Sequence, residues 1–150
     1  MKHVILLKRL LLLIWAVWMS IVFLTNLADA GKGLGLLRES WSFASGNWNL
    51  LQKTTARYAM PSSVNAVLFA GVILWEGLAA MLFWLAGLSY RGRGSARKVL
   101  YLAFMTSLLL WAAFLVADEI LISYDLESPH LRLFVAHLVT LLAVDLLPEG

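Results

Sequence analysis

The stretch LLLLIWAVWMSIVFLTNLA, residues 10–28, contains no charged residue and decides the fold class. Its 19 residues would form a helix of about 28 Å, close to the thickness of the hydrocarbon core of a bilayer. A second charge-free run of the same length, VLYLAFMTSLLLWAAFLVA, covers residues 99–117. The sequence therefore predicts helices that cross a membrane.

The overall composition points to the same class of protein. Of the 150 residues, 61% are hydrophobic and only 14% are charged, whereas a soluble domain of this size needs a more charged surface. The absence of cysteine excludes disulfides, thiolate catalysis and cysteine-ligated metals. The net charge of +3 comes from basic residues spread over loops beside apolar runs, so we expect no nucleic acid partner.

Four spans can be placed from the positions of the charged residues and prolines. Glu76 is the only charged residue between Arg57 and Arg91, and Pro61 suits the first turn of a helix there. Near the C-terminus, Ser128 suits an N-cap before Pro129. The predicted spans cover residues 8–28, 62–88, 99–120 and 129–147. Together they predict an all-α membrane protein, a four-transmembrane-helix bundle that forms a single domain over residues 1–150.

Lysine and arginine in short connections predict the orientation. Seven of the twelve basic residues lie at or before the start of span one, or in and next to the connection between spans two and three, two regions that an even number of spans places on the same side. These residues are Lys2, Lys8, Arg9, Arg91, Arg93, Arg97 and Lys98. Because basic residues favour the cytoplasmic side, we expect both termini in the cytoplasm, the N-in/C-in arrangement.

The first apolar run also has features of a cleavable signal peptide. Basic residues precede an apolar core over residues 10–24, and Ala28-Asp29-Ala30 fits a small-x-small cleavage site. The 15-residue core lies at the upper edge of the range for signal peptides. Cleavage and a retained first helix both fit this pattern, and a retained helix is our expectation.

The first outer loop contains a helical pattern. Trp48, Leu51, Thr55 and Tyr58 recur at intervals of three and four residues, which places them on one face of a helix. This pattern predicts a short interfacial helix. Such a helix can act as a lid or docking surface, or as a connector held by its own aromatic residues, and we favour the connector.

Polar residues inside the predicted spans are the candidate functional residues. Asn65 and Glu76 are eleven residues apart, about three helical turns, and so share one face of span two. A charged acid at mid-membrane costs about 2.5–3.5 kcal/mol, so Glu76 should face protein or water rather than lipid, and should be either paired or protonated. Counting residues from the span ends places His137, Thr106 and Ser107 at a similar depth. We therefore predict a mid-membrane polar cluster of these side chains.

This mid-membrane cluster has two interpretations. It is either a proton-handling or ligand-binding site, or an interhelical hydrogen-bond clasp that fixes the bundle. We favour the clasp. A second cluster is predicted at the outer ends of the spans, where Arg132 could bridge carboxylates. Its expected members are Asn26, Asp29, Asp118, Glu119 and Arg132.

Cofactor and enzyme motifs are not apparent. Bis-histidine haem is not expected, because His130 and His137 share one span and His3 lies at the inner face. The sequence has no HExxH metal motif and no glycine-elbow serine. We expect neither catalytic activity nor a metal, and no cofactor, although a bound lipid, quinone or pigment stays open.

Two short motifs resemble a known family. Asn26-Leu-Ala-Asp29 at the end of span one and Trp75-Glu76 in span two are similar to motifs of predicted small bacterial integral membrane proteins of unknown function. That family has a Gly-Glu-Trp motif at the end of span three, where this chain has Ala117-Asp118-Glu119-Ile120. The resemblance covers nearly the whole chain. It implies a multi-pass protein of the bacterial inner membrane and emphasises Asn26, Asp29 and Glu76, but it implies no reaction.

These observations favour one function over two others. Little of the chain lies outside the spans, and much of it is apolar or aromatic. We expect a non-catalytic accessory subunit of a larger membrane complex, for example an energy-transducing one, with membrane lipids and other membrane protein subunits as its partners. The alternatives are a small proton-coupled carrier that uses Glu76 and His137, and a membrane sensor.

Overall fold

The computed structural model describes residues 2–92, 94 and 97–148, and within them it contains helices and no strands. The elements are α1 (Lys2–Gly33), α2 (Asn47–Thr55), the 3-10 helix η1 (Ala56–Tyr58), α3 (Ser62–Ser89), α4 (Arg97–Leu121) and α5 (Tyr124–Leu146). Four of these described helices, α1, α3, α4 and α5, are long and apolar enough to cross a membrane. The predicted all-α fold with four long apolar helices is confirmed.

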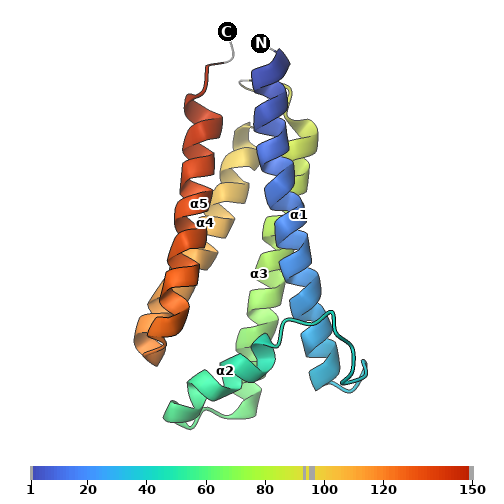
Figure 1. The fold of residues 1–150 in the computed structure, drawn as a ribbon, viewed down its shortest axis with the longest axis vertical. Coiled ribbons are helices and arrows are strands. Elements are labelled where there is room, and N and C mark those ends of the chain that lie inside the picture. Colours follow the sequence, from blue (N-terminus) through green and yellow to red (C-terminus); the bar gives the residue numbers. More distant parts are fainter. Residues whose placement is uncertain (1, 93, 95–96, 149–150) are drawn as a thin grey trace.

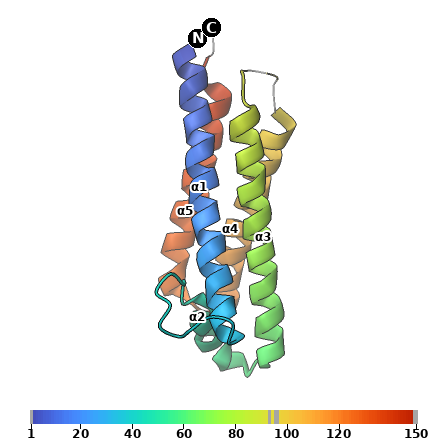
Figure 2. The same ribbon diagram turned by 90° about the vertical axis from the view of Figure 1, so that its right-hand side faces the viewer.

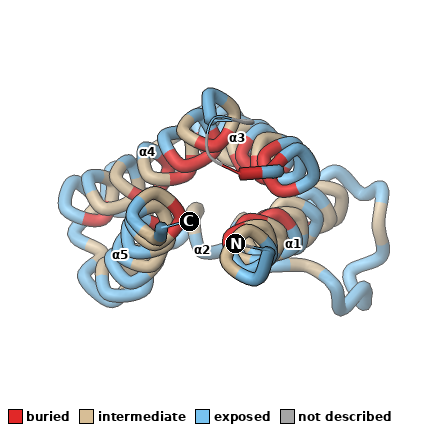
Figure 3. The backbone as a smooth tube through the Cα atoms, turned by 90° about the horizontal axis from the view of Figure 1, so that it is seen from above, coloured by how far each residue is buried: buried red, intermediate tan, exposed pale blue. Residues whose placement is uncertain are grey.

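The four long helices pack against one another in the order α1, α3, α4, α5. Figure 2 shows α1 and α3 running beside each other along the length of the bundle. Viewed along the bundle, the four long helices form an arc rather than a closed ring (Figure 3). Both chain ends lie at one end of the bundle, which we call the terminal end (Figure 1). The loop 34–46 and α2 lie at the opposite end, which we call the loop end. There, α4 and α5 lean away from α1 and α3.

Two glycines on α3 allow α1 to approach closely. A Cβ atom on Gly77 would lie 3.1 Å from the ring of Phe23, and one on Gly87 would lie 2.7 Å from a methyl group of Leu13. The two contacts are ten residues apart on each helix and run in opposite directions along the chain, as expected for antiparallel helices. These contacts fix the register of the α1–α3 pair.

The core consists of large apolar side chains, and indole groups add hydrogen bonds between helices. Phe83 and Phe104 are fully buried and pack edge to face, with ring centroids 5.1 Å apart. Trp75 Nε1 donates to the Thr106 carbonyl at 2.9 Å, and Trp84 Nε1 donates to Ser20 Oγ at 3.0 Å. These two bonds join α3 to α4 and to α1. They are favourable because lipid offers no hydrogen-bond partner for an N–H group.

Near the terminal end, α1 also contacts α5. Trp15 Nε1 donates to Thr140 Oγ1 at 3.0 Å, and Lys8 Nζ donates to the Leu147 carbonyl at 2.7 Å. Both α1 donors lie in the first half of that helix. The arc is therefore held together at the terminal end and open at the loop end.

The fourth span begins earlier than the sequence predicts. The helix α5 starts at Tyr124 with Ser123 as its N-cap, and Pro129 lies inside it. The expected start at Pro129, with Ser128 as the cap, is wrong. Asp125 and Glu127 occupy the first turn, where negative charge is favourable next to the unpaired N–H groups.

The predicted helix in the loop after span one is present. It forms α2 and continues as η1 up to Tyr58. Tyr58 donates its hydroxyl hydrogen to the Ile120 carbonyl at the end of α4. This bond joins the α2–η1 segment to the far side of the bundle.

The close approach at Gly87 generates the first prediction. Gly87→Val should lower the free energy of unfolding by about 1–3 kcal/mol, because its side chain overlaps Leu13. The matched control is Gly71→Val on the same helix, where an added Cβ meets nothing within 4 Å. Thermal unfolding in detergent measures both. Equal melting temperatures would contradict the register.

Candidate functional site

The most buried acid in the spans is Glu76, whose side chain is 2% exposed. It lies on the face of α3 that packs against α1, next to Gly77, where the two helices approach closely. The expectation that this carboxyl group faces protein rather than lipid is met. A buried carboxyl group in such a place needs hydrogen-bond partners.

The partner of Glu76 is Asn26 on α1. Asn26 Nδ2 lies 2.8 Å from both carboxyl oxygens of Glu76 and donates to them, and Asn26 is 1% exposed. The other end of the same amide, Oδ1, accepts a hydrogen bond of 2.9 Å from Asn47 Nδ2 at the start of α2. A continuous row of hydrogen bonds therefore runs from Asn47 through Asn26 to Glu76. We call these three residues the polar row.

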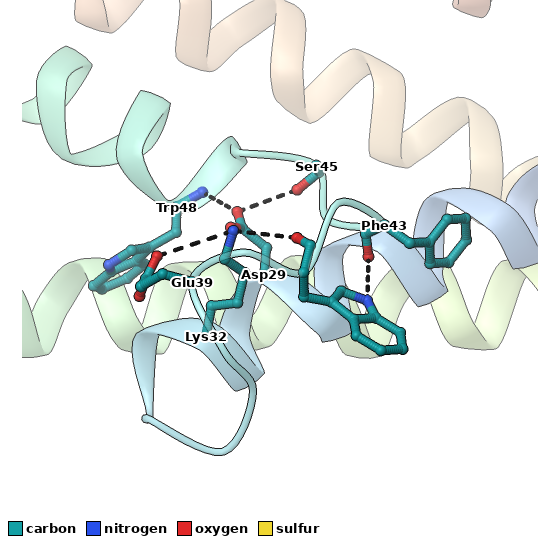
Figure 4. A network of polar contacts seen from close by, with 7 residues as sticks. Asp29, Lys32, Glu39, Phe43, Ser45 and Trp48 are labelled. Carbon is teal, nitrogen blue, oxygen red and sulfur yellow. Dashed lines mark hydrogen bonds and ion pairs between the residues drawn. The ribbon is translucent and has the colours of Figure 1, made fainter.

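A second acid lies one turn further along α1 and holds the loop. Asp29 is 6% exposed, and its Oδ2 accepts hydrogen bonds from Ser45 Oγ at 3.2 Å and from the Trp48 backbone N–H at 2.7 Å (Figure 4). The N-cap of α2, Gly46, offers no side chain for the free N–H groups of that helix. Asp29 therefore caps α2 from a neighbouring helix, and α1 positions the loop.

The predicted contact between Glu76 and His137 does not occur. His137 Nδ1 donates to the Leu133 carbonyl at 2.9 Å, and its ring packs on Trp15 with centroids 3.6 Å apart. The ring of Phe83 also lies beside it, at a centroid distance of 5.8 Å. Because Phe83 follows Glu76 by seven residues on α3, His137 lies about 10 Å closer to the terminal end.

The error in depth has a physical origin. Glu76 lies thirteen residues before the end of α3 at Ser89, and His137 lies nine residues before the end of α5 at Leu146. That offset alone is about 6 Å along the helix axis. The lean of α5 relative to α3 adds to it. Counting residues along the sequence therefore assigned the two side chains a similar depth that they do not have in the structure.

The other predicted members of the mid-membrane cluster lie apart from Glu76. Ser107 is buried and donates to the Phe104 carbonyl of its own helix at 3.1 Å. Thr106 takes part through its backbone carbonyl, which accepts from Trp75. Asn65 is 3% exposed, and its Oδ1 has no hydrogen-bond partner among the described residues. The hydrogen-bond partner of Glu76 is therefore Asn26 rather than a member of the predicted mid-membrane cluster.

The predicted outer cluster is divided between two places. Asn26 and Asp29 bind the loop, as described above. Asp118 pairs instead with His130 across the α4–α5 interface, with Nδ1 and Oδ2 2.6 Å apart. Arg132 and Glu119 are exposed, so the expected arginine bridge is wrong. Residues 130 and 132 are two positions apart, about 200° around a helix, so with His130 facing α4 the Arg132 side chain points away from it.

Sequence reasoning missed three contributors to the site. Asn47, Ser45 and the Trp48 N–H group all come from the loop end, and they become partners only when the loop folds back over α1. A usable signal was present in the motif around Asn26 and Asp29, which are three residues apart and so share one helix face. A polar pair on one face of a span needs polar partners.

The polar row and the Asp29 bonds define what this region can do. Asn26 connects a carboxyl group inside the span to a loop outside it, so a change at Glu76 alters the anchor of Asn47. In either protonation state, Glu76 accepts from the Asn26 amide. The arrangement therefore suits a clasp between α1, α2 and α3.

The second prediction concerns this clasp. Asn26→Leu leaves the Glu76 carboxyl group buried without a donor, and should lower the free energy of unfolding by about 1–3 kcal/mol. The double variant Asn26→Leu/Glu76→Met removes both partners and should recover much of that loss. Asn47 is exposed and can bind water instead. Thermal unfolding in detergent compares the variants, and a double variant less stable than Asn26→Leu would refute the clasp.

Comparisons with known proteins agree with the fold. The model of one family, described as predicted small integral membrane protein (DUF2165), matches residues 4–120, which contain α1 to α4 almost entirely and the whole polar row. Searches of curated proteins and of solved structures each returned no match. Because the family model covers well over half of the 150 residues, the chain belongs to this family of small integral membrane proteins of unknown function.

Proposed function

We propose that this protein is a non-catalytic accessory subunit of a larger membrane complex. The observation that carries the proposal is the exposure of α5. Among the described residues of this helix, only His137 and Val144 are buried. Its exposed face is made of large apolar side chains, namely Leu131, Val135, Leu138, Val139, Leu142 and Leu146. Such a face suits packing against the transmembrane helix of another subunit.

The use of the acids in the long helices supports this proposal. Glu76 is bonded to Asn26, Asp118 to His130, and Asp145 accepts from the Tyr101 hydroxyl at 2.7 Å. Each of these bonds joins two different helices. These acids therefore hold pairs of helices together, which fits a structural role better than a catalytic one.

We further propose a location in the bacterial inner membrane with both termini in the cytoplasm. The terminal end carries Lys2, Lys8 and Arg9 together with the basic connection between α3 and α4. By the positive-inside rule this end faces the cytoplasm. The loop 34–46 and α2 then lie at the opposite membrane interface.

The third prediction tests this orientation. The chain has no cysteine, so single cysteines can be introduced without background. In spheroplasts, a membrane-impermeant maleimide should label Ser42→Cys in the loop, whereas Lys2→Cys should react only after the membrane is permeabilised. Labelling of Lys2→Cys alone before permeabilisation would reverse the proposed orientation, and labelling of both positions would contradict a membrane-spanning α1.

The fourth prediction tests the subunit role. Mild detergent extraction of the tagged protein should yield a stable complex with other membrane proteins in fixed stoichiometry. Val139→Trp should reduce the yield of that complex, since the residue is 57% exposed on the apolar face of α5. The matched control is Leu74→Trp, which is 73% exposed on α3 and should leave the complex intact.

A second function is favoured by the polar row, which links a buried carboxyl group to the loop end. A small proton-coupled carrier or a membrane sensor would use such a link. This alternative rests on Glu76 alone, because His137 lies elsewhere. Should the extracted protein migrate by itself, and should Glu76→Gln abolish proton flux in proteoliposomes while Asp118→Asn does not, the carrier would replace the subunit.

A further inference from the structure

A polar cavity of about 490 Å³ lies at the loop end, between the last turn of α1, the loop 34–46 and the start of α2. Three charged side chains line it, Asp29, Lys32 and Glu39, together with the indole rings of Trp41 and Trp48. Serine hydroxyls of the loop complete the wall. The cavity is open to the surroundings on the side of the loop, and its charged groups are close together in Figure 4.

Several polar groups of the cavity wall are incompletely bonded. The Lys32 ammonium lies 4.0 Å from Glu39 and 3.4 Å from the Trp41 carbonyl, both long contacts. Within the described part of the chain, Asp29 uses Oδ2 for its two hydrogen bonds, and its Oδ1 accepts none. The cavity therefore presents a free carboxylate oxygen and a weakly bonded ammonium group.

The charge balance restricts the chemistry of an occupant. Asp29 and Glu39 carry two negative charges and Lys32 carries one positive charge, so the wall has a net charge of −1. A simple anion is disfavoured by this balance. A group that bears an N–H cation beside an anionic oxygen matches both signs, since the cation donates to the carboxylates and the oxygen accepts from Lys32.

The surroundings of the cavity indicate a lipid environment. The same loop exposes Leu34 (75%), Leu36 (76%), Trp41 (51%) and Phe43 (48%). Apolar and aromatic side chains in a loop next to a membrane-spanning helix are typical of the interface between headgroups and acyl chains. The cavity thus lies at the level where zwitterionic headgroups occur.

We propose that this cavity binds the headgroup of a phosphatidylethanolamine-type lipid. Its primary ammonium group donates to Asp29 Oδ1 and Glu39, and its phosphate accepts from Lys32. Leu34, Leu36 and Phe43 contact the acyl chains. A choline headgroup fits less well, because it has no N–H to donate, and a glycerol headgroup lacks the cation.

Native mass spectrometry of the detergent-purified protein tests this assignment. The protein is mixed with phosphatidylethanolamine, phosphatidylcholine and phosphatidylglycerol of identical acyl chains, and bound lipid is quantified. Phosphatidylethanolamine should be retained at least about fivefold more than the other two, because its ammonium group adds charge-assisted hydrogen bonds to two carboxylates. Equal retention of the three lipids would overturn the proposal.

Substitutions separate the cavity from general lipid binding. Glu39→Gln should remove much of the preference, because it removes one acceptor of the ammonium group. Lys32→Gln should instead lower the retention of all three lipids, because each carries a phosphate. Lys53→Gln, an exposed lysine of α2 outside the cavity, should change neither quantity. Asp29 is left intact because it also holds the loop, and unchanged melting temperatures establish that the variants are folded. A preference unaffected by Glu39→Gln, or a retention of the three lipids unaffected by Lys32→Gln, would also overturn the proposal.

A soluble competitor distinguishes a membrane lipid from a free metabolite of the same chemistry. Glycerophosphoethanolamine, a phosphodiester, has the same charged groups but no acyl chains, so it should displace the lipid only at concentrations about a hundredfold higher. Displacement at equal concentrations would show that the acyl chains contribute nothing. The cavity would then be a site for a soluble zwitterion, contrary to the proposal.

Discussion

The constraint on which the rest of the structure depends is the presence of a carboxyl group within a membrane-spanning helix. Hydrocarbon offers Glu76 neither water nor a donor, so the protein must supply both shelter and hydrogen bonds. Gly77 lets α1 approach, and Asn26 then reaches both oxygens of the carboxyl group. The second end of the Asn26 amide binds Asn47, so the same constraint fixes where α2 begins.

The helices and their number could be predicted from sequence because the relevant physics is local. Runs such as residues 99–117 carry no charge over the thickness of a bilayer, and a helix satisfies its own backbone there. The inward position of Glu76 followed from the cost of exposing a charge to lipid. These arguments need only the composition along the chain, and no knowledge of which helices are neighbours.

The partners within the site could not be predicted in the same way, because they depend on register and tilt. His137 is a reasonable partner for Glu76 by depth, but α5 begins at Tyr124 and leans away from α3. The rotation of α5 places His130 against Asp118 and leaves Arg132, on the opposite face, exposed. Asn47 is brought over α1 by the loop 34–46, and the path of this loop leaves no periodic pattern in the sequence. Hydrogen bonds between separate elements were therefore the part that sequence patterns left undetermined.

The most direct measurement is of the side-chain amide resonances of asparagine, of which the chain has four. In protein labelled with nitrogen-15 on asparagine and placed in lipid nanodiscs, Glu76→Gln should shift the signals of Asn26 and Asn47. The same substitution should not shift the signal of Asn49, and His137→Phe should not shift the signal of Asn26. Asn26 signals that are not shifted by Glu76→Gln, or that are shifted equally by His137→Phe, would contradict the hydrogen bond between α1 and α3 as the basis of this structure.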